Sequence, residues 1–214
     1  MAAVLSIAAL VSTRSFADTV TLTQPGIHGS TGGGEFIATP TGGLLGSTAF
    51  RTFCIEHNEF INFNTPYNYV LSNAAVMGGV AGGNPDPISL GTAWLYSQYR
   101  QGVLVNYTGN TLSQDTLQNA FWWLENEITL ATPEANSYLA AARTSLASFG
   151  VSTLADLRQD AGAWNFGVYA MNLTDQNGIK KQDQLAYVSV PEASASFLLG
   201  MSLTGLLWFV RRKK

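Results

Sequence analysis

Apolar and polar residues alternate in several short runs over the first third of the chain. The runs at 19–23, 35–39 and 50–56 are rich in β-forming residues and are separated by glycine-rich stretches typical of turns. A longer loop is predicted over 74–89, because Asn84-Pro85-Asp86-Pro87 combines turn residues with a stop to any helix. This part of the chain is therefore predicted to form strands joined by turns and loops.

The middle of the chain changes to a helical pattern. We predict helices over 90–101, 113–130 and 133–149. The second helix has Ser113 as its expected N-cap and ends before Pro133. Its apolar residues recur at helical spacing and should face the core: Leu117, Phe121, Leu124 and Ile128.

Strand-like alternation returns near the end of the chain. We predict a strand over 163–171, with Trp164, Phe166 and Val168 on one face, and a final strand over 183–190. The order of strands, helices and strands indicates an α+β fold. We expect a β-rich barrel or sandwich core with an inserted helical subdomain.

Composition and charge narrow the function classes. The chain has 214 residues, enough for one domain, and only 12% of them are charged. Between Asp18 and Glu192 it carries six basic and fourteen acidic residues, a net charge of −8, which disfavours nucleic acid and other polyanions as partners. The single cysteine excludes an internal disulfide and a cysteine-cluster zinc site, and two histidines leave little room for a histidine-rich metal site. We expect no metal and no cofactor.

The N-terminal segment has the pattern of an export signal. Residues 2–11 form a short apolar run with no lysine or arginine before it, and Ser15-Phe16-Ala17 follows as a small-x-small cleavage site. We therefore expect residues 1–17 to be a secretory signal peptide.

The C-terminal segment has three parts. Val190-Pro191-Glu192 comes first, an apolar run of 18 residues over 193–210 follows, and four cations close the chain: Arg211, Arg212, Lys213 and Lys214. The apolar run is long enough for a transmembrane helix, and the basic tail should stay on the cytoplasmic side.

This tail resembles the PEP-CTERM sorting signal of Gram-negative bacteria, with Ala193 in place of the second proline of the motif. The resemblance implies export through the inner membrane, transient anchoring there, and removal of residues 190–214 by an exosortase. It also implies a final location at the cell surface or in an extracellular matrix, often beside exopolysaccharide. Residues 18–189 would then form the exported domain.

Two motifs in that domain carry candidate chemistry. Phe53-Cys54-Ile55 lies in a predicted strand, and Gln118-Asn119-Ala120-Phe121-Trp122 lies in a predicted helix. Together they resemble the thioester domains of bacterial surface adhesins, in which such a cysteine is joined to such a glutamine. The resemblance implies a Cys54–Gln118 thioester surrounded by Phe53, Ile55, Ala120, Phe121 and Trp122. The implied function is single-use covalent capture of an amine-bearing partner, for adhesion or cross-linking, without enzymatic turnover.

Two other interpretations of Cys54 stay open. Free cysteine behaves as a small buried hydrophobe, so the protein is alternatively a non-covalent structural or exopolysaccharide-associated matrix protein. A cysteine hydrolase would need His28 or His57 as its base. His57 follows Cys54 by three residues, and in a strand the two side chains point to opposite faces, which disfavours that pair.

The remaining polar and aromatic residues have ordinary interpretations. We expect the neighbouring acids to be solvated and not an opposed glycosidase pair: Glu56, Glu59, Glu125 and Glu127. We place Asp86, Asp175 and Asp183 in loops that lack the spacing of a calcium site. Five tyrosines are taken as exposed residues able to stack on sugars: Tyr67, Tyr69, Tyr96, Tyr99 and Tyr107.

Overall fold

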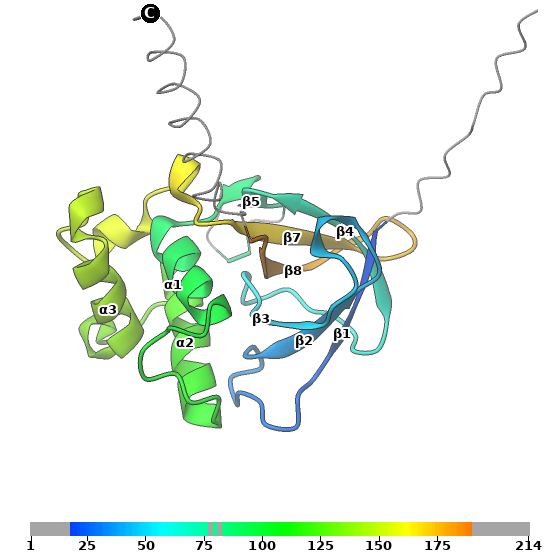
Figure 1. The fold of residues 1–214 in the computed structure, drawn as a ribbon, viewed down its shortest axis with the longest axis horizontal. Helices are drawn as coiled ribbons and strands as arrows, with labels where there is room; N and C mark the ends of the chain where they lie inside the picture. The colour runs from blue at the N-terminus through cyan, green and yellow to red at the C-terminus, as the bar shows by residue number, and fades with distance from the viewer. Residues whose placement is uncertain (1–17, 77–78, 81–82, 190–214) are drawn as a thin grey trace, which may run out of the picture.

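In the part of the chain that the structure describes, the fold combines a six-stranded antiparallel sheet with three α-helices, which confirms the predicted α+β class (Figure 1). The computed structural model describes residues 18–76, 79–80 and 83–189. The predicted signal peptide and sorting tail lie outside these residues. Within the described part, no helix is both long and apolar enough to cross a bilayer.

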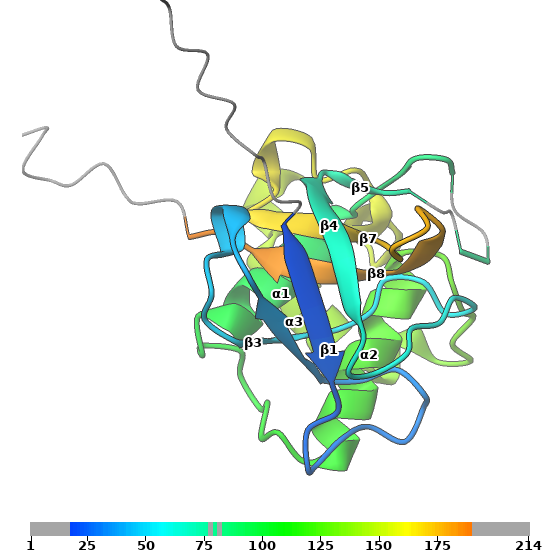
Figure 2. The same cartoon turned by 90° about the vertical axis from the view of Figure 1, so that its right-hand side faces the viewer.

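The sheet follows the period-two pattern of its strands. In β1 (Thr19–Thr23), Val20 and Leu22 are fully buried and alternate with half-buried threonines. From one edge to the other the strands run β3 (Phe50–Thr52), β2 (Phe36–Pro40), β1, β4 (Pro66–Ser72), β7 (Val168–Thr174) and β8 (Lys180–Tyr187). Figure 2 shows β1 and β4 side by side in this order.

The two edge strands of the sheet are joined by the residues that follow β3. Leu185 N–H donates to Phe53 O at 2.9 Å, and Ile55 N–H donates to Asp183 O at 3.0 Å. Cys54 lies opposite Gln184 in this pairing. The segment 53–55 therefore closes the curled sheet against β8, and Cys54 lies on that seam.

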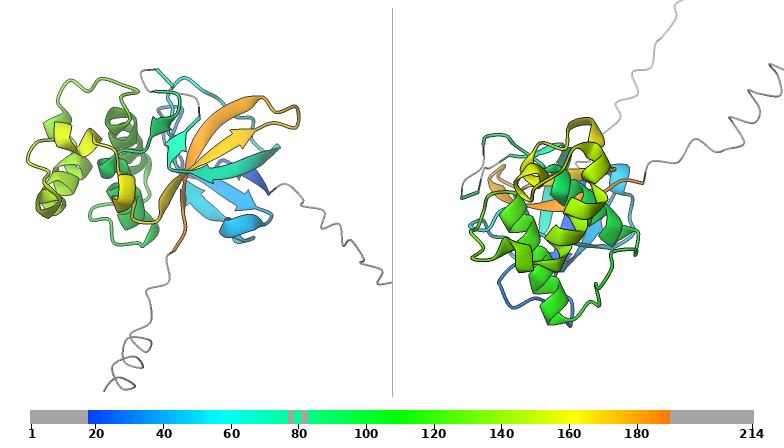
Figure 3. Two further views of the ribbon diagram at one scale, coloured as in Figure 1. Left: turned by 90° about the horizontal axis from the view of Figure 1, so that it is seen from above. Right: turned by 90° about the vertical axis from the view of Figure 1, so that its left-hand side faces the viewer.

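The helices form an insertion, as predicted. The helices α1 (Leu90–Arg100), α2 (Thr111–Leu124) and α3 (Ser137–Ser145) all come between β4 and β7, which are neighbours in the sheet. Figure 3 shows the helices gathered on one side of the sheet. A small pair of strands, β5 (Ala74–Ala75) and β6 (Asp86–Pro87), precedes them where we predicted only a loop.

The helix boundaries correct the prediction. The N-cap of α2 is Asn110, whose side chain accepts from Ser113 N–H at 2.8 Å, so Ser113 is inside the helix. The helix ends at Leu124 and not near 130, because the backbone at Asn126 enters the left-handed region with φ +63°. The third helix begins at Ser137 after the Asn136 cap and not at residue 133.

One strand prediction was wrong at its start, and one strand was missed. The run 163–171 begins as a short 3-10 turn in which Trp164 is 60% exposed, and Phe166 has φ +51°, so β7 starts only at Val168. Strand β4 was not predicted, because its tyrosines were taken as exposed loop residues. Three of the five tyrosines are in fact buried: Tyr67, Tyr69 and Tyr96.

Helix α2 contributes to two apolar clusters. Leu117, Phe121 and Leu124 are buried between the sheet and the other helices, as predicted, whereas Ile128 lies after the helix and is half-buried. Trp122 belongs instead to the cluster inside the curled sheet. The adjacent residues Phe121 and Trp122 thus pack into different clusters, and together they hold the helical insertion against the sheet.

Leu117 offers a direct test of this packing. Leu117→Ala should lower the free energy of unfolding by about 2–5 kcal/mol, because it opens a cavity around a side chain that is fully buried. Leu112→Ala is the matched control, since Leu112 is in the same helix but 75% exposed, and should change stability by about 0.5 kcal/mol or less. Urea unfolding measures both. Equal losses from the two variants would contradict the described core.

Candidate thioester site

The structure brings Cys54 and Gln118 together from opposite parts of the fold. Cys54 comes from the seam of the sheet and Gln118 from the second turn of α2. The Cys54 thiol donates to Gln118 Oε1 at 3.4 Å, and Gln118 Nε2 donates to the Cys54 carbonyl at 2.9 Å. The side-chain amide therefore lies directly against the cysteine.

A third residue fixes the amide from the other side. Gly34 N–H donates to Gln118 Oε1 at 2.9 Å. Oxygen Oε1 thus accepts from both the thiol and a backbone N–H, which is the arrangement that polarises a carbonyl toward nucleophilic attack. Sequence analysis missed Gly34, and the only sequence signal was its place in the run Gly32-Gly33-Gly34.

The site is sealed from solvent. Cys54 and Gln118 are both 0% exposed. Burial, and next the nearby Glu56 charge, raise the pKa of the Cys54 thiol well above its usual range, while N–H groups of Trp122 and Gly34 act in the opposite direction. The cysteine is therefore held as a neutral thiol, and Trp122 Nε1 has no hydrogen-bond acceptor among the described residues.

The predicted surrounding residues are all buried but do not all share one cluster. Trp122 packs with Cys54 inside the sheet. Phe53, Ile55, Ala120 and Phe121 lie in the cluster between the sheet and the helices, where the Phe53 and Phe121 rings are 5.3 Å apart. The site therefore lies where the two clusters meet, with apolar side chains on both sides.

A glycine-rich strap, defined here as residues 28–34, covers Gln118. A β-carbon at Gly33 would lie 2.5 Å from Trp122 Cζ2 and 2.9 Å from Gln118 Cγ, so no larger residue fits there. Gly34 has φ +112°, a conformation that side chains other than glycine rarely adopt. Close contact with the site therefore explains the glycine at 33, and the backbone conformation explains the glycine at 34.

Polar contacts hold the strap on α2. The Asp115 carboxylate, one turn before Gln118, accepts from Ser30 N–H at 2.7 Å and Ser30 Oγ at 2.6 Å, and more weakly from Thr31. Thr111 Oγ1 donates to His28 O at 3.1 Å. These bonds are exposed to solvent, so the strap is attached by contacts that cost little to break.

Neither histidine pairs with Cys54. The His57 ring packs edge-on against Trp122 at 4.6 Å, and its backbone N–H donates to Glu127. His28 Nδ1 contacts the Pro25 carbonyl at 3.3 Å. Within the described residues the cysteine therefore has no base at hydrogen-bond distance, and the hydrolase interpretation gains no support.

The acids differ from expectation. Glu56, Glu125 and Glu127 are at most 4% exposed, so they are not the solvated surface residues we predicted. Asp183 is buried within β8 and not in a loop, whereas Asp175 caps a turn as expected. No group of three or more acidic, histidine or cysteine side chains suited to a metal ion occurs in the described part of the chain.

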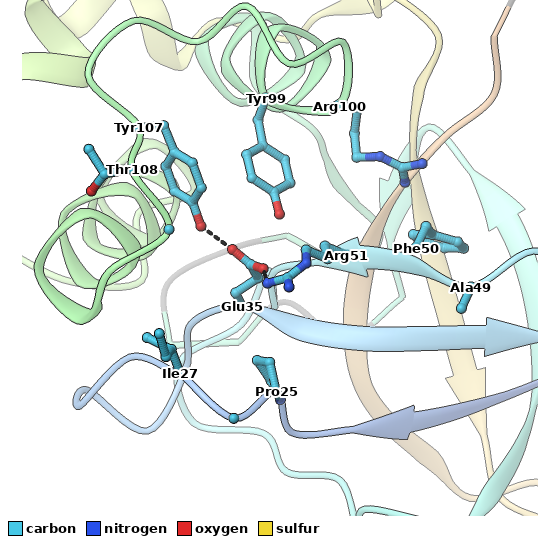
Figure 4. Close-up of a pocket in the computed structure, with 12 residues that line it drawn as sticks. Pro25, Ile27, Glu35, Ala49, Phe50, Arg51, Tyr99, Arg100, Tyr107 and Thr108 are labelled. Atoms are coloured by element: carbon cyan, nitrogen blue, oxygen red, sulfur yellow. Dashed lines mark hydrogen bonds and ion pairs between the residues drawn. The ribbon is translucent and has the colours of Figure 1, made fainter.

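A cavity of about 740 Å³ opens beside the strap (Figure 4). At its floor the buried Glu35 carboxylate is ion-paired with Arg51 and accepts a hydrogen bond from the Tyr107 hydroxyl. Tyr99 and Tyr107 line it, but both are half-buried and not exposed as we predicted, and burial raises the pKa of both phenols well above their usual range. Glu35 and Arg51 were not found from the sequence, because neither belongs to a motif.

No family model, curated protein or solved structure matches this chain. The two resemblances therefore rest on the motif residues themselves.

The buried Glu56 beside Cys54 predicts how the stability of the protein depends on pH. Burial first, and the neighbouring Asp183 and Glu59 charges next, raise the pKa of Glu56 above its usual range. Above about pH 4.5 the folded state keeps a proton on Glu56 that the unfolded state releases. The contribution of Glu56 to the free energy of unfolding is therefore fully present below about pH 4.5 and falls as pH rises. Glu56→Gln has no such proton and should show a shallower fall between pH 5 and 9.

Urea unfolding at several pH values measures this difference. The exposed Glu134→Gln is the matched control and should follow the unsubstituted protein at every pH. Parallel curves for the unsubstituted protein and Glu56→Gln would show that Glu56 does not titrate differently on folding.

Proposed function

We propose that the protein captures an amine-bearing partner covalently, through an internal thioester between Cys54 and Gln118. The observation that carries the proposal is the contact of the Cys54 thiol with Gln118 Oε1 at 3.4 Å, inside a site with 0% exposure of either residue. A buried glutamine with every amide atom committed to this cysteine and to Gly34 is unusual for simple packing.

Formation of the bond follows from these contacts. The sulfur adds to the side-chain carbonyl carbon of Gln118 while the thiol proton passes to Oε1, which already accepts from Gly34 N–H. The carbon–nitrogen bond then breaks, and the amide nitrogen leaves with that proton as ammonia. One thiol and one carboxamide thus give one thioester and one ammonia.

Exclusion of water makes such a bond useful. An amide is a poor acyl donor, so the fold must hold the two groups in contact to overcome its low reactivity. Once formed, a thioester is open to hydrolysis wherever water can reach it. The strap and Trp122 cover Gln118 and keep it dry, which would preserve the acyl group until a partner arrives.

Capture reverses the roles of the two residues. A partner amine attacks the acyl carbon of Gln118, the carbon–sulfur bond breaks, and the amine proton ends on the Cys54 sulfur. Gly34 N–H, which donates to Gln118 Oε1 at 2.9 Å, would stabilise the negative charge that develops on this oxygen during the attack. The product is an amide between Gln118 and the partner, so each molecule reacts once.

The proposed setting comes from the two ends of the sequence. Export by a signal peptide at 1–17, sorting by an exosortase at Val190-Pro191-Glu192 and a place at the cell surface or in the extracellular matrix all fit a capture protein. Its partner would be an amine-bearing surface ligand. A non-covalent, exopolysaccharide-associated matrix protein is the second candidate, supported by the apolar cluster that surrounds Cys54.

Intact mass decides between these two candidates. The purified protein should be lighter than its sequence by one ammonia, because thioester formation releases the amide nitrogen of Gln118. Methylamine should add across the thioester. The mass should then equal that of the sequence minus one ammonia plus one methylamine. The Cys54→Ala variant, prepared alongside, should have its full sequence mass and should not react.

A full sequence mass for the unsubstituted protein, together with a thiol that labels as soon as the protein is unfolded, would reject the thioester. Cys54 would then be a core residue, and the matrix-protein candidate would take its place.

The strap predicts a second, kinetic result. Asp115→Ala removes at least two hydrogen bonds to Ser30, each worth about 1 kcal/mol net. The strap should open more often, so the rate of methylamine addition, followed by mass, should rise about tenfold or more.

Thr116→Ala is the matched control for Asp115→Ala. Thr116 is the next residue of α2, and its hydroxyl bonds only within the helix, to Leu112 O at 2.7 Å. It should leave the methylamine rate unchanged. An unchanged rate in Asp115→Ala would show that the strap does not control access to Gln118.

A further inference from the structure

The cavity of Figure 4 lies next to the proposed thioester without being part of it. Gly34 contacts Gln118 Oε1, and the next residue, Glu35, lies at the cavity floor. The residue that contacts Gln118 and a residue that lines the cavity are thus neighbours in the chain, although Gln118 itself does not line the cavity. Pro25, Gly26 and Ile27, which lead into the strap, form another wall. A molecule in the cavity would therefore touch the chain at both ends of the strap.

The charges in the cavity favour an anionic group. The Glu35 carboxylate is compensated by Arg51 and by the Tyr107 hydroxyl, so the floor does not repel a second carboxylate. Arg100, at the end of α1, has no carboxylate within ion-pair distance among the described residues. Within the described chain, Arg100 is therefore an unpaired cation in a domain whose net charge is −8.

Arg100 is also held in place. Its guanidinium lies 4.6 Å from the centre of the Phe50 ring and contacts the Tyr96 hydroxyl at 3.4 Å. A guanidinium fixed by stacking presents its donors as a planar fork that matches a carboxylate. Figure 4 shows Arg100 above Phe50 at the side of the cavity away from Tyr107.

The size of the space indicates more than a single small anion. About 740 Å³ is within the range of pockets that bind drug-sized molecules, and a second hollow of about 280 Å³ continues past Arg100 and Phe50. Arg100 thus lies between two hollows that together suit an extended segment. Along the larger one the half-buried Tyr99 offers a neutral hydroxyl, whereas the Tyr107 hydroxyl already donates to Glu35.

From these features we propose that the cavity docks a carboxylate-bearing peptide segment of the partner, with the carboxylate on Arg100 and a nearby lysine directed at Gln118. This inference rests on the proposed thioester for the role of the lysine, but the docking of the carboxylate stands on the cavity alone. The partner is accordingly a protein that has an aspartate or glutamate near its reactive lysine.

Binding to the cavity can be tested without any thioester. In the Cys54→Ala protein, the blocked peptide acetyl-Glu-Gly-Lys-amide should bind at least tenfold more tightly than acetyl-Gln-Gly-Lys-amide, as measured by isothermal titration calorimetry. Arg100→Gln should remove this preference, whereas Arg100→Lys should retain part of it because the charge remains. Arg143→Gln, an exposed arginine on α3, is the matched control and should keep the full preference.

Capture by the unsubstituted protein gives the second readout. The rate of peptide addition divided by the rate of methylamine addition should be at least tenfold greater for the glutamate peptide than for the glutamine peptide. Absence of the ammonia deficit would reject the thioester and leave this readout silent, while calorimetry would still decide the docking site.

Three results would overturn the docking proposal. They are equal affinity for the two peptides, no binding of either at millimolar concentration, or a preference that survives Arg100→Gln with its folding intact. Binding of free galacturonate without binding of the glutamate peptide would assign the cavity to an acidic sugar and would also overturn the peptide assignment.

Discussion

The position of the helical insertion against the sheet depends on the hydrogen bonds of the Gln118 side chain. Its amide bonds to the Cys54 carbonyl and the Gly34 N–H, so one residue of α2 links the seam of the sheet to the strap. Leaving these buried polar groups unpaired would cost about 1–3 kcal/mol each. The helical insertion is therefore fixed against the sheet by polar contacts at one point and by apolar packing around it, and the proposed chemistry occurs at that same point.

The sequence predicted the elements that have simple periodicity and missed those that depend on partners. Strand 19–23 and the buried face of Leu117, Phe121 and Leu124 follow directly from alternation and helical spacing. The end of α2 does not, because it is set by the left-handed backbone at Asn126 and not by the distant Pro133. Strand β4 was missed because tyrosine is compatible with both surface and core, and only the rest of the sheet decides.

The candidate site shows the same division. The motifs around Cys54 and Gln118 could be found along the chain, since residue type and order carry the resemblance. Gly34, Asp115 and Glu35 could not, because their roles depend on contacts between segments more than 80 residues apart or on a cavity that exists only once the sheet and helices meet. Burial of Glu56 and Glu125 was hidden for a related reason: acids are usually exposed, and the exceptions are made by the fold.

The closure of the sheet at 53–55 has a mechanical consequence. The backbone bonds that hold Cys54 in place pair it with 183–185, the strand that leads to the C-terminal end of the described chain. Tension along β8 would load these bonds in shear, all at once, which is the direction in which paired strands resist separation best. A Cys54–Gln118 bond would tie α2 to this seam before capture. Capture breaks that bond, so load on an attached partner would pass through α2 and its packing against α1 and α3.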